Sequence, residues 1–138
     1  MNLNINKEDL LEPLMKVIGV IERRQTLPIL SNVYLNLQNK TLSLTGTDLE
    51  VQVTAKGFID SDAEIKTTLP GRKLLDICRS LPDQANLKLN FQEGKVLINS
   101  GKSRFVLRTL PAAEYPLFDE LQYTNEFSIE RDVLFKAL

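Results

Sequence analysis

The chain has 138 residues, enough for one domain with a substantial hydrophobic core. Its 17 basic and 18 acidic residues leave a net charge of −1, whereas a protein that holds nucleic acid by overall charge alone is usually basic. It has no histidine, which removes the commonest general base and metal ligand, and its one cysteine, Cys78, excludes a disulfide within the chain.

The first predicted element is a half-buried strand over residues 2–6, where Leu3 and Ile5 alternate with asparagines. This alternation is unlike a signal peptide, and no apolar run approaches the roughly 20 residues of a membrane span. We therefore expect a cytoplasmic protein that does not bind membranes.

A helix is predicted next, with Asn6 as its cap and Asp9 in its first turn. Its apolar residues recur at helical spacing: Leu10, Leu11, Leu14, Val17, Ile18 and Ile21. Its outward face mixes charges of both signs: Asp9, Glu12, Lys16 and Arg23. A loop with two adjacent guanidinium groups, Arg23 and Arg24, should follow it.

Alternating apolar residues then predict strands over residues 31–38, 41–45, 50–56 and 63–69. Asn39 and Lys40 form a tight hairpin turn, residues 46–48 form the next turn, and residues 60–62 break the pattern again.

A second helix of about three turns fits between Gly71 and Pro82. At helical spacing its apolar side is made of Leu74, Ile77, Cys78 and Leu81, with Leu75 at the margin. Arg72 and Arg79 fall on the opposite side with Asp76 between them, and Lys73 lies on the flank. Such a cationic face is either simply solvated or a binding surface.

The pattern then repeats, with strands over residues 86–92, 95–99 and 102–109 and with turns at Glu93-Gly94 and Ser100-Gly101. The order is β-α-β-β-β twice, which indicates an internal duplication. We predict an α+β fold in which two helices pack on one side of antiparallel sheets.

Residues 126–138 align with residues 2–14, so a third copy of the unit begins there. We therefore divide the chain into a first domain over residues 1–125 and, over residues 126–138, the first strand and partial helix of a second, truncated domain. The hypothesis is that the sequence is a fragment of a longer repeat protein.

Five segments, in this order, resemble the bacterial DNA polymerase III β subunit family, the DNA sliding clamps. They are TLPIL (26–30), TLSLTGTDLE (41–50), RKLLDICRSLP (72–82), SGKSRF (100–105) and RTLPAAEYP (108–116). The resemblance covers residues 1–116, and residues 126 onward resemble the start of the family's second domain.

The resemblance implies the DNA-clamp fold and a non-catalytic processivity factor without a cofactor. In that family, three-domain subunits form a head-to-tail dimeric ring, with helices lining the hole that encircles double-stranded DNA. A ring holds DNA topologically, so a modest cationic lining on an acidic body suffices and tight phosphate binding would impede sliding. The implied DNA-binding residues are Arg24 and Arg72. Arg79 faces the same way as Arg72, and Lys16 and Arg23 are added from helical phase.

The resemblance also implies a subunit junction along the strand after SGKSRF, where basic residues meet an acidic third domain of the second clamp subunit. The matching residues are Lys73, Lys102, Arg104, Phe105 and Leu107. Charges on an edge strand could equally prevent unwanted pairing. The family's other partners, the polymerase III catalytic subunit and the clamp loader, bind a cleft in domains that this sequence lacks.

Two other functions remain open. Asp48, Glu50, Asp60, Asp62 and Glu64 are possible Mg²⁺ ligands of an enzyme, although acids at strand ends and turns are ordinarily turn formers. The second alternative is a protein-binding module that never meets DNA. Helices that lie side by side and point into one hollow favour a clamp; helices on opposite surfaces would exclude it.

Overall fold

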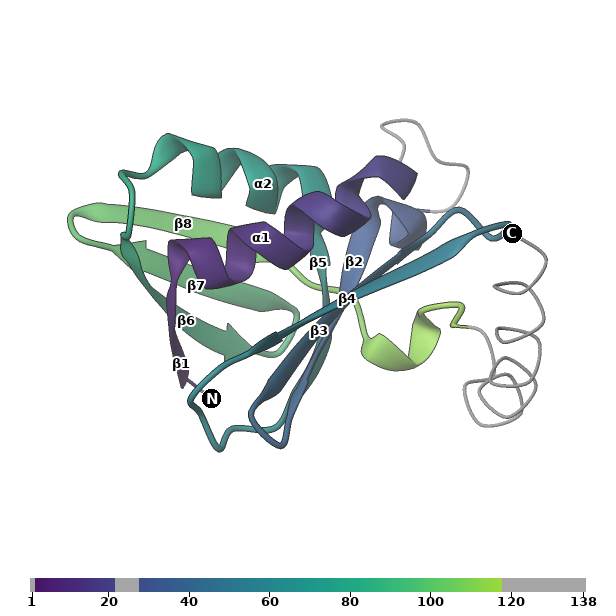
Figure 1. Cartoon of the computed structure of the whole chain (residues 1–138), viewed down its shortest axis with the longest axis horizontal. Coiled ribbons are helices and arrows are strands. Elements are labelled where there is room, and N and C mark those ends of the chain that lie inside the picture. Colours follow the sequence, from purple (N-terminus) through teal and green to yellow (C-terminus); the bar gives the residue numbers. More distant parts are fainter. Residues whose placement is uncertain (1, 22–27, 118–138) are drawn as a thin grey trace, which may run out of the picture.

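The computed structural model describes residues 2–21 and 28–117 (Figure 1). The elements are β1 (Asn2–Asn6), α1 (Lys7–Val17), a 3-10 helix (Ile18–Val20), a second 3-10 helix (Pro28–Ser31), β2 (Asn32–Gln38), β3 (Thr41–Thr47), β4 (Gln52–Phe58), β5 (Ile65–Pro70), α2 (Gly71–Ser80), β6 (Asn86–Gln92), β7 (Lys95–Ser100), β8 (Ser103–Arg108) and a third 3-10 helix (Ala112–Glu114). The predicted order of strands and helices, β-α-β-β-β twice, is confirmed.

The strands form two four-stranded antiparallel sheets with the orders β1-β6-β7-β8 and β4-β3-β2-β5. Each sheet therefore takes three strands from one unit and its fourth from the other, because β1 pairs with β6 and β5 pairs with β2. Both helices lie on one side of the sheets, as predicted (Figure 1). The exchange of strands makes the two halves one domain.

The core lies between the helices and the inner faces of the sheets. In β1 the alternation works as predicted, since Leu3 and Ile5 are buried and stand opposite Leu89 and Leu87 of β6. Burial of such side chains stabilises the fold by roughly 1.5–3 kcal/mol each relative to exposure. Because the two units share this core, removal of either unit would expose buried apolar side chains of the other to solvent.

The helices follow the predicted apolar faces with one correction. The side chain of Asn6 accepts a hydrogen bond from the backbone N–H of Glu8 at 3.0 Å, which confirms the cap of α1. Leu75, expected at the margin of the apolar side of α2, is only 4% exposed. It is buried because α1 packs alongside α2 and covers that margin.

Two predicted turns are displaced. Gly46 lies inside β3, where a Cβ would come within 3.0 Å of Val20 and 3.1 Å of the Val17 carbonyl oxygen. The glycine therefore allows close approach of the end of α1, and the turn itself begins at Asp48. The last hairpin turns at Gly101-Lys102, not Ser100-Gly101, since β7 continues to Ser100 and Gly101 adopts φ +58°.

After β8 the chain crosses to the other sheet and is held there by a buried polar network. Thr68 of β5 donates from Oγ1 to the Leu110 carbonyl at 2.8 Å. The Tyr115 hydroxyl lies 3.1 Å from the Asn32 carbonyl oxygen and 3.3 Å from that of Thr45, and its ring packs on Tyr34. Residues 109–117 thus tie the two sheets together on the side opposite the helices (Figure 1).

Candidate nucleic-acid interface

The two helices lie side by side and run antiparallel (Figure 1). Their direction follows from two hydrogen bonds between the start of each helix and the end of the other. Lys7 at the start of α1 donates from Nζ to the Leu81 carbonyl at 2.8 Å, and Arg72 at the start of α2 donates from Nη2 to the Ile21 carbonyl at 2.7 Å. The helices therefore present one continuous surface, which is the geometry that the clamp interpretation requires.

Arg72 is less free than the helical pattern predicts. Its side chain is half-buried, Nη2 is bound to Ile21, and Nε is buried with no hydrogen-bond partner among the described residues. The reason is that the first turn of α2 lies against the 3-10 turn that ends α1. Arg72 therefore lines the surface with part of its guanidinium while another part joins the two helix ends.

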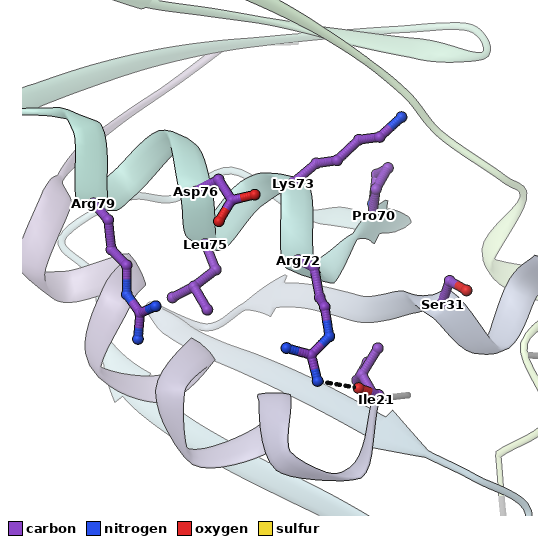
Figure 2. A pocket seen from close by; sticks show the side chains of 8 residues that line it. All are labelled: Ile21, Ser31, Pro70, Arg72, Lys73, Leu75, Asp76 and Arg79. Carbon is purple, nitrogen blue, oxygen red and sulfur yellow. Dashed lines mark hydrogen bonds between the residues drawn. The ribbon is translucent and has the colours of Figure 1, made fainter. Parts of the chain in front are cut away.

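Arg72 and Arg79 project from α2 on the same side, whereas Lys73 points away from both (Figure 2). Together with Asp76 they line an open groove whose apolar lining comes from Ile21, Pro70 and Leu75. Lys73, Asp76 and Arg79 are exposed. Among the residues that line the groove, three cations against one carboxylate favour an anionic ligand.

The α1 candidates are placed less favourably. Lys16 is exposed, but it shares a shallow pocket with Asp9 and Glu12, which oppose its attraction for phosphate. Arg23 and Arg24 lie outside the described residues. Ile21, the last residue described before them, is the one whose carbonyl Arg72 holds.

The predicted subunit junction falls on β8, which is an edge strand of its sheet. Lys73 on α2, Lys102 in the turn before β8 and Arg104 on β8 are all exposed. Phe105 is half-buried and Leu107 is 6% exposed, and both pack against the open edge of the domain's own core. They are therefore less available than expected, and their part in a junction stays a prediction.

Comparison with known proteins identifies the family. Residues 1–119 match the family described as DNA polymerase III beta subunit, N-terminal domain. The chain belongs to this family. It is 47% identical to the beta sliding clamp of Pseudomonas aeruginosa over 135 residues, 97% of this chain and 37% of that protein. It is 43% identical to the beta sliding clamp of Escherichia coli over 130 residues, 94% of this chain and 36% of that protein.

Solved structures of the family share the fold. A sliding clamp (DNA polymerase III subunit beta) from Pseudomonas aeruginosa bound to griselimycin superposes with a TM-score of 0.82 at 47% identity, over 87% of this chain and 33% of that chain. A polymerase III beta chain from Caulobacter crescentus also superposes with a TM-score of 0.82, at 38% identity, over 88% of this chain and 33% of that chain. The chain thus spans about a third of the length of the relatives it matches.

Three of the five acidic residues considered as metal ligands have other partners: Asp48, Asp60 and Asp62. Asp48 accepts from the backbone N–H groups of Val51 at 2.8 Å and Glu50 at 2.9 Å, which lowers the pKa of its carboxyl. Asp60 and Asp62 each lie 3.1 Å from Lys40 Nζ and raise its pKa. Within residues 2–21 and 28–117, no three acidic or cysteine side chains form a metal-binding cluster, and no helix could cross a membrane.

Lys7 is the residue that sequence reasoning missed. It is 6% exposed, and besides Leu81 it meets Asp83 at 3.8 Å between Nζ and Oδ1. Glu8 accepts from the backbone N–H of Gln84 at 2.9 Å, so the first turn of α1 holds the loop after α2. Helical phase contains no signal for this role, because it depends on which segment lies beside the helix start.

Proposed function

We propose that this chain supplies the first domain of a DNA sliding clamp, a ring that encircles duplex DNA and tethers the replicative polymerase. The observation that carries the proposal is the pair of antiparallel helices with Arg72 and Arg79 on one groove. The family match supports it. On this proposal the domain is non-catalytic and cytoplasmic. It contributes a helix-lined surface that faces the DNA and a moderate electrostatic attraction for phosphates.

The mechanism follows from the charges. Arg72 and Arg79 attract phosphates through a groove that also holds Asp76, so the net attraction is modest. Each phosphate neutralised adds salt-dependent affinity, and affinity slows movement along the duplex. Encirclement then retains the clamp on DNA without high affinity for phosphate. We infer that Arg23 and Arg24, which follow Ile21 in the chain, belong to the same DNA-binding surface.

Ring closure would use the edge strand β8. An edge strand offers unpaired backbone N–H and C=O groups to a neighbouring subunit, and Lys73, Lys102 and Arg104 would meet acidic groups there. Phe105 and Leu107 would extend the core across the junction. The polymerase III catalytic subunit and the clamp loader would bind through the parts of the relatives that this chain does not span.

A chimera tests the proposal. Residues 1–119 of this chain replace the matching segment of the Pseudomonas aeruginosa beta sliding clamp, and a purified clamp loader places the product on nicked circular DNA. We expect retention on circular DNA and release when a restriction enzyme linearises it. Arg72→Ala/Arg79→Ala should reduce loading in a salt-dependent manner, whereas Lys66→Ala/Lys95→Ala, on the outer faces of the two sheets, should not.

Two outcomes would contradict the proposal. Equal retention on linear and circular DNA would show adhesion without encirclement. A chimera that forms rings but never associates with either DNA would favour the alternative of a protein-binding module.

A further inference from the structure

The outer face of the β1-β6-β7-β8 sheet, turned away from the helices, carries four exposed cations. These are Lys88 on β6, Lys95 on β7 and Arg104 and Arg108 on β8; we call them the outer basic face. The other residues of these four strands that share this face are amides and two apolar side chains, and none is a carboxylate. The net charge of the whole chain is −1, so this face is locally more basic than the chain as a whole.

The strand register places an apolar pair at the centre of the outer basic face. Leu97 stands opposite Val106, and Val106 is 57% exposed. On one side of this pair Lys95 stands opposite Arg108, and on the other Asn99 lies between Arg104 and Lys88. An apolar centre within a charged rim is the usual anatomy of a protein-binding patch.

The fold alone does not account for these charges. Lys95 and Arg108 stand directly opposite each other in the sheet. Like charges in such a position destabilise the fold. No cation of the outer basic face pairs with a carboxylate of the described residues, in contrast to Lys40 between Asp60 and Asp62. Protection of an edge explains Arg104 and Arg108 on β8, but Lys88 and Lys95 lie on interior strands.

We propose that the outer basic face binds an acidic segment of a partner protein. An apolar side chain of the partner packs on Leu97 and Val106. Flanking carboxylates meet the other three cations of this face, since Arg104 already belongs to the proposed subunit junction. The exposed Val106 and the lack of any aromatic side chain on this face favour a peptide over single-stranded nucleic acid, which needs stacking platforms. The face is opposite the helices, so it is independent of the proposed DNA surface and both can be occupied together.

The test uses a labelled peptide, EEDLLDEE, and the 138-residue chain in low salt. We expect a dissociation constant below about 1 mM by fluorescence anisotropy, weakening as salt screens the charges. Amide NMR shifts should be confined to β6, β7 and β8. Lys88→Gln/Lys95→Gln should weaken binding at least fivefold, and Val106→Ser should weaken it with no change in charge.

Two controls separate this proposal from general attraction. Lys56→Gln/Lys66→Gln removes the same charge from the outer face of the other sheet and should leave binding unchanged. The peptide EEDSSDEE should bind more weakly than EEDLLDEE. Three results would each overturn the proposal. The first is an equal loss of peptide affinity in both double variants, the second is equal binding of the two peptides, and the third is tighter binding of a 12-base-pair duplex to this face.

Discussion

Arg72 and Ile21 are 51 positions apart in the chain, yet Arg72 Nη2 donates to the Ile21 carbonyl oxygen at 2.7 Å. The bond has a counterpart at the other end of the helix pair, where Lys7 Nζ donates to the Leu81 carbonyl at 2.8 Å. Each helix therefore begins with a cation that holds the end of its neighbour. Because these carbonyls follow helix ends, they lack partners within their own helices and a donor from outside satisfies them.

Arg72→Ala should lower the free energy of unfolding, since it leaves the Ile21 carbonyl without its charged donor. A hydrogen bond to a charged group is worth about 1.5–3 kcal/mol, and we expect a loss of about 1–3 kcal/mol in urea denaturation. Arg79→Ala removes an exposed cation of the same groove and should change stability by less than about 0.5 kcal/mol. Equal stability of the two variants would show that the Arg72 bond contributes nothing.

Asp76→Asn should strengthen duplex binding, because it removes the carboxylate from a groove lined by Arg72, Lys73 and Arg79. Charge pairs at such exposed positions are weak, so we expect a gain of roughly two- to fivefold at low salt. A titration of a 20-base-pair duplex measured by anisotropy would show it. Glu93→Gln, the same charge change on the distant β6–β7 turn, is the matched control and should leave affinity unchanged.

Gly46→Ala should destabilise the domain, because its Cβ would lie 3.0 Å from Val20 Cγ2 and 3.1 Å from the Val17 backbone oxygen. Overpacking of this kind costs about 1–3 kcal/mol. Gly57→Ala is the control, since a Cβ there meets nothing within 4 Å. Thermal unfolding should therefore shift downward for the first variant only, and a comparable shift for both would contradict the close approach of α1 to β3.

Tyr115→Phe should cost about 1–2 kcal/mol in urea denaturation, because its one hydroxyl hydrogen is shared between two buried carbonyl oxygens, those of Asn32 and Thr45. The aromatic contact with Tyr34 is kept in the variant, so the loss isolates the hydrogen bonds. Tyr34→Phe keeps the ring on the other side of this contact, so its stability is the comparison for removal of a tyrosine hydroxyl at Tyr115.

The same residue predicts a loss of stability in alkali. Burial raises the pKa of Tyr115 from 10.0 to about 12. Between these values the folded chain keeps a proton that the unfolded chain has lost, so stability falls as pH rises from 10 to 12. Urea midpoints at pH 9, 10 and 11 should decline less steeply for Tyr115→Phe than for the parent chain; parallel declines would contradict this assignment.

Cys78 should be almost unreactive in the folded chain. It is fully buried, and burial raises the pKa of its thiol from 9.0 to about 11. A rise of two units lowers the thiolate fraction at pH 8 about 100-fold, and the thiolate is the nucleophile. Iodoacetamide labelling followed by mass spectrometry should thus be at least 100-fold slower in buffer than in 6 M guanidinium; comparable rates would show that the α2 core opens readily.

Local structure follows from short-range patterns of residues. Alternation in β1 and β6, helical spacing in α1 and α2, and asparagine and glycine at the turns each depend on residues a few positions apart, so the element order and the α+β class follow from them. The family resemblance likewise depends on segments in order, and it pointed to the DNA polymerase III beta subunit family that the comparisons confirm.

The pairing of strands between the two units depends on the packed core and not on local pattern. An antiparallel partner for β1 could be β2 or β6 by local pattern, because both alternate in the same way, and the choice of β6 is made by the core that both units share. The same holds for the site. Helical phase placed Arg72 and Arg79 on one face, but it could not show that Ile21 holds Arg72 or that Lys7 is buried, since both contacts join residues more than 50 positions apart.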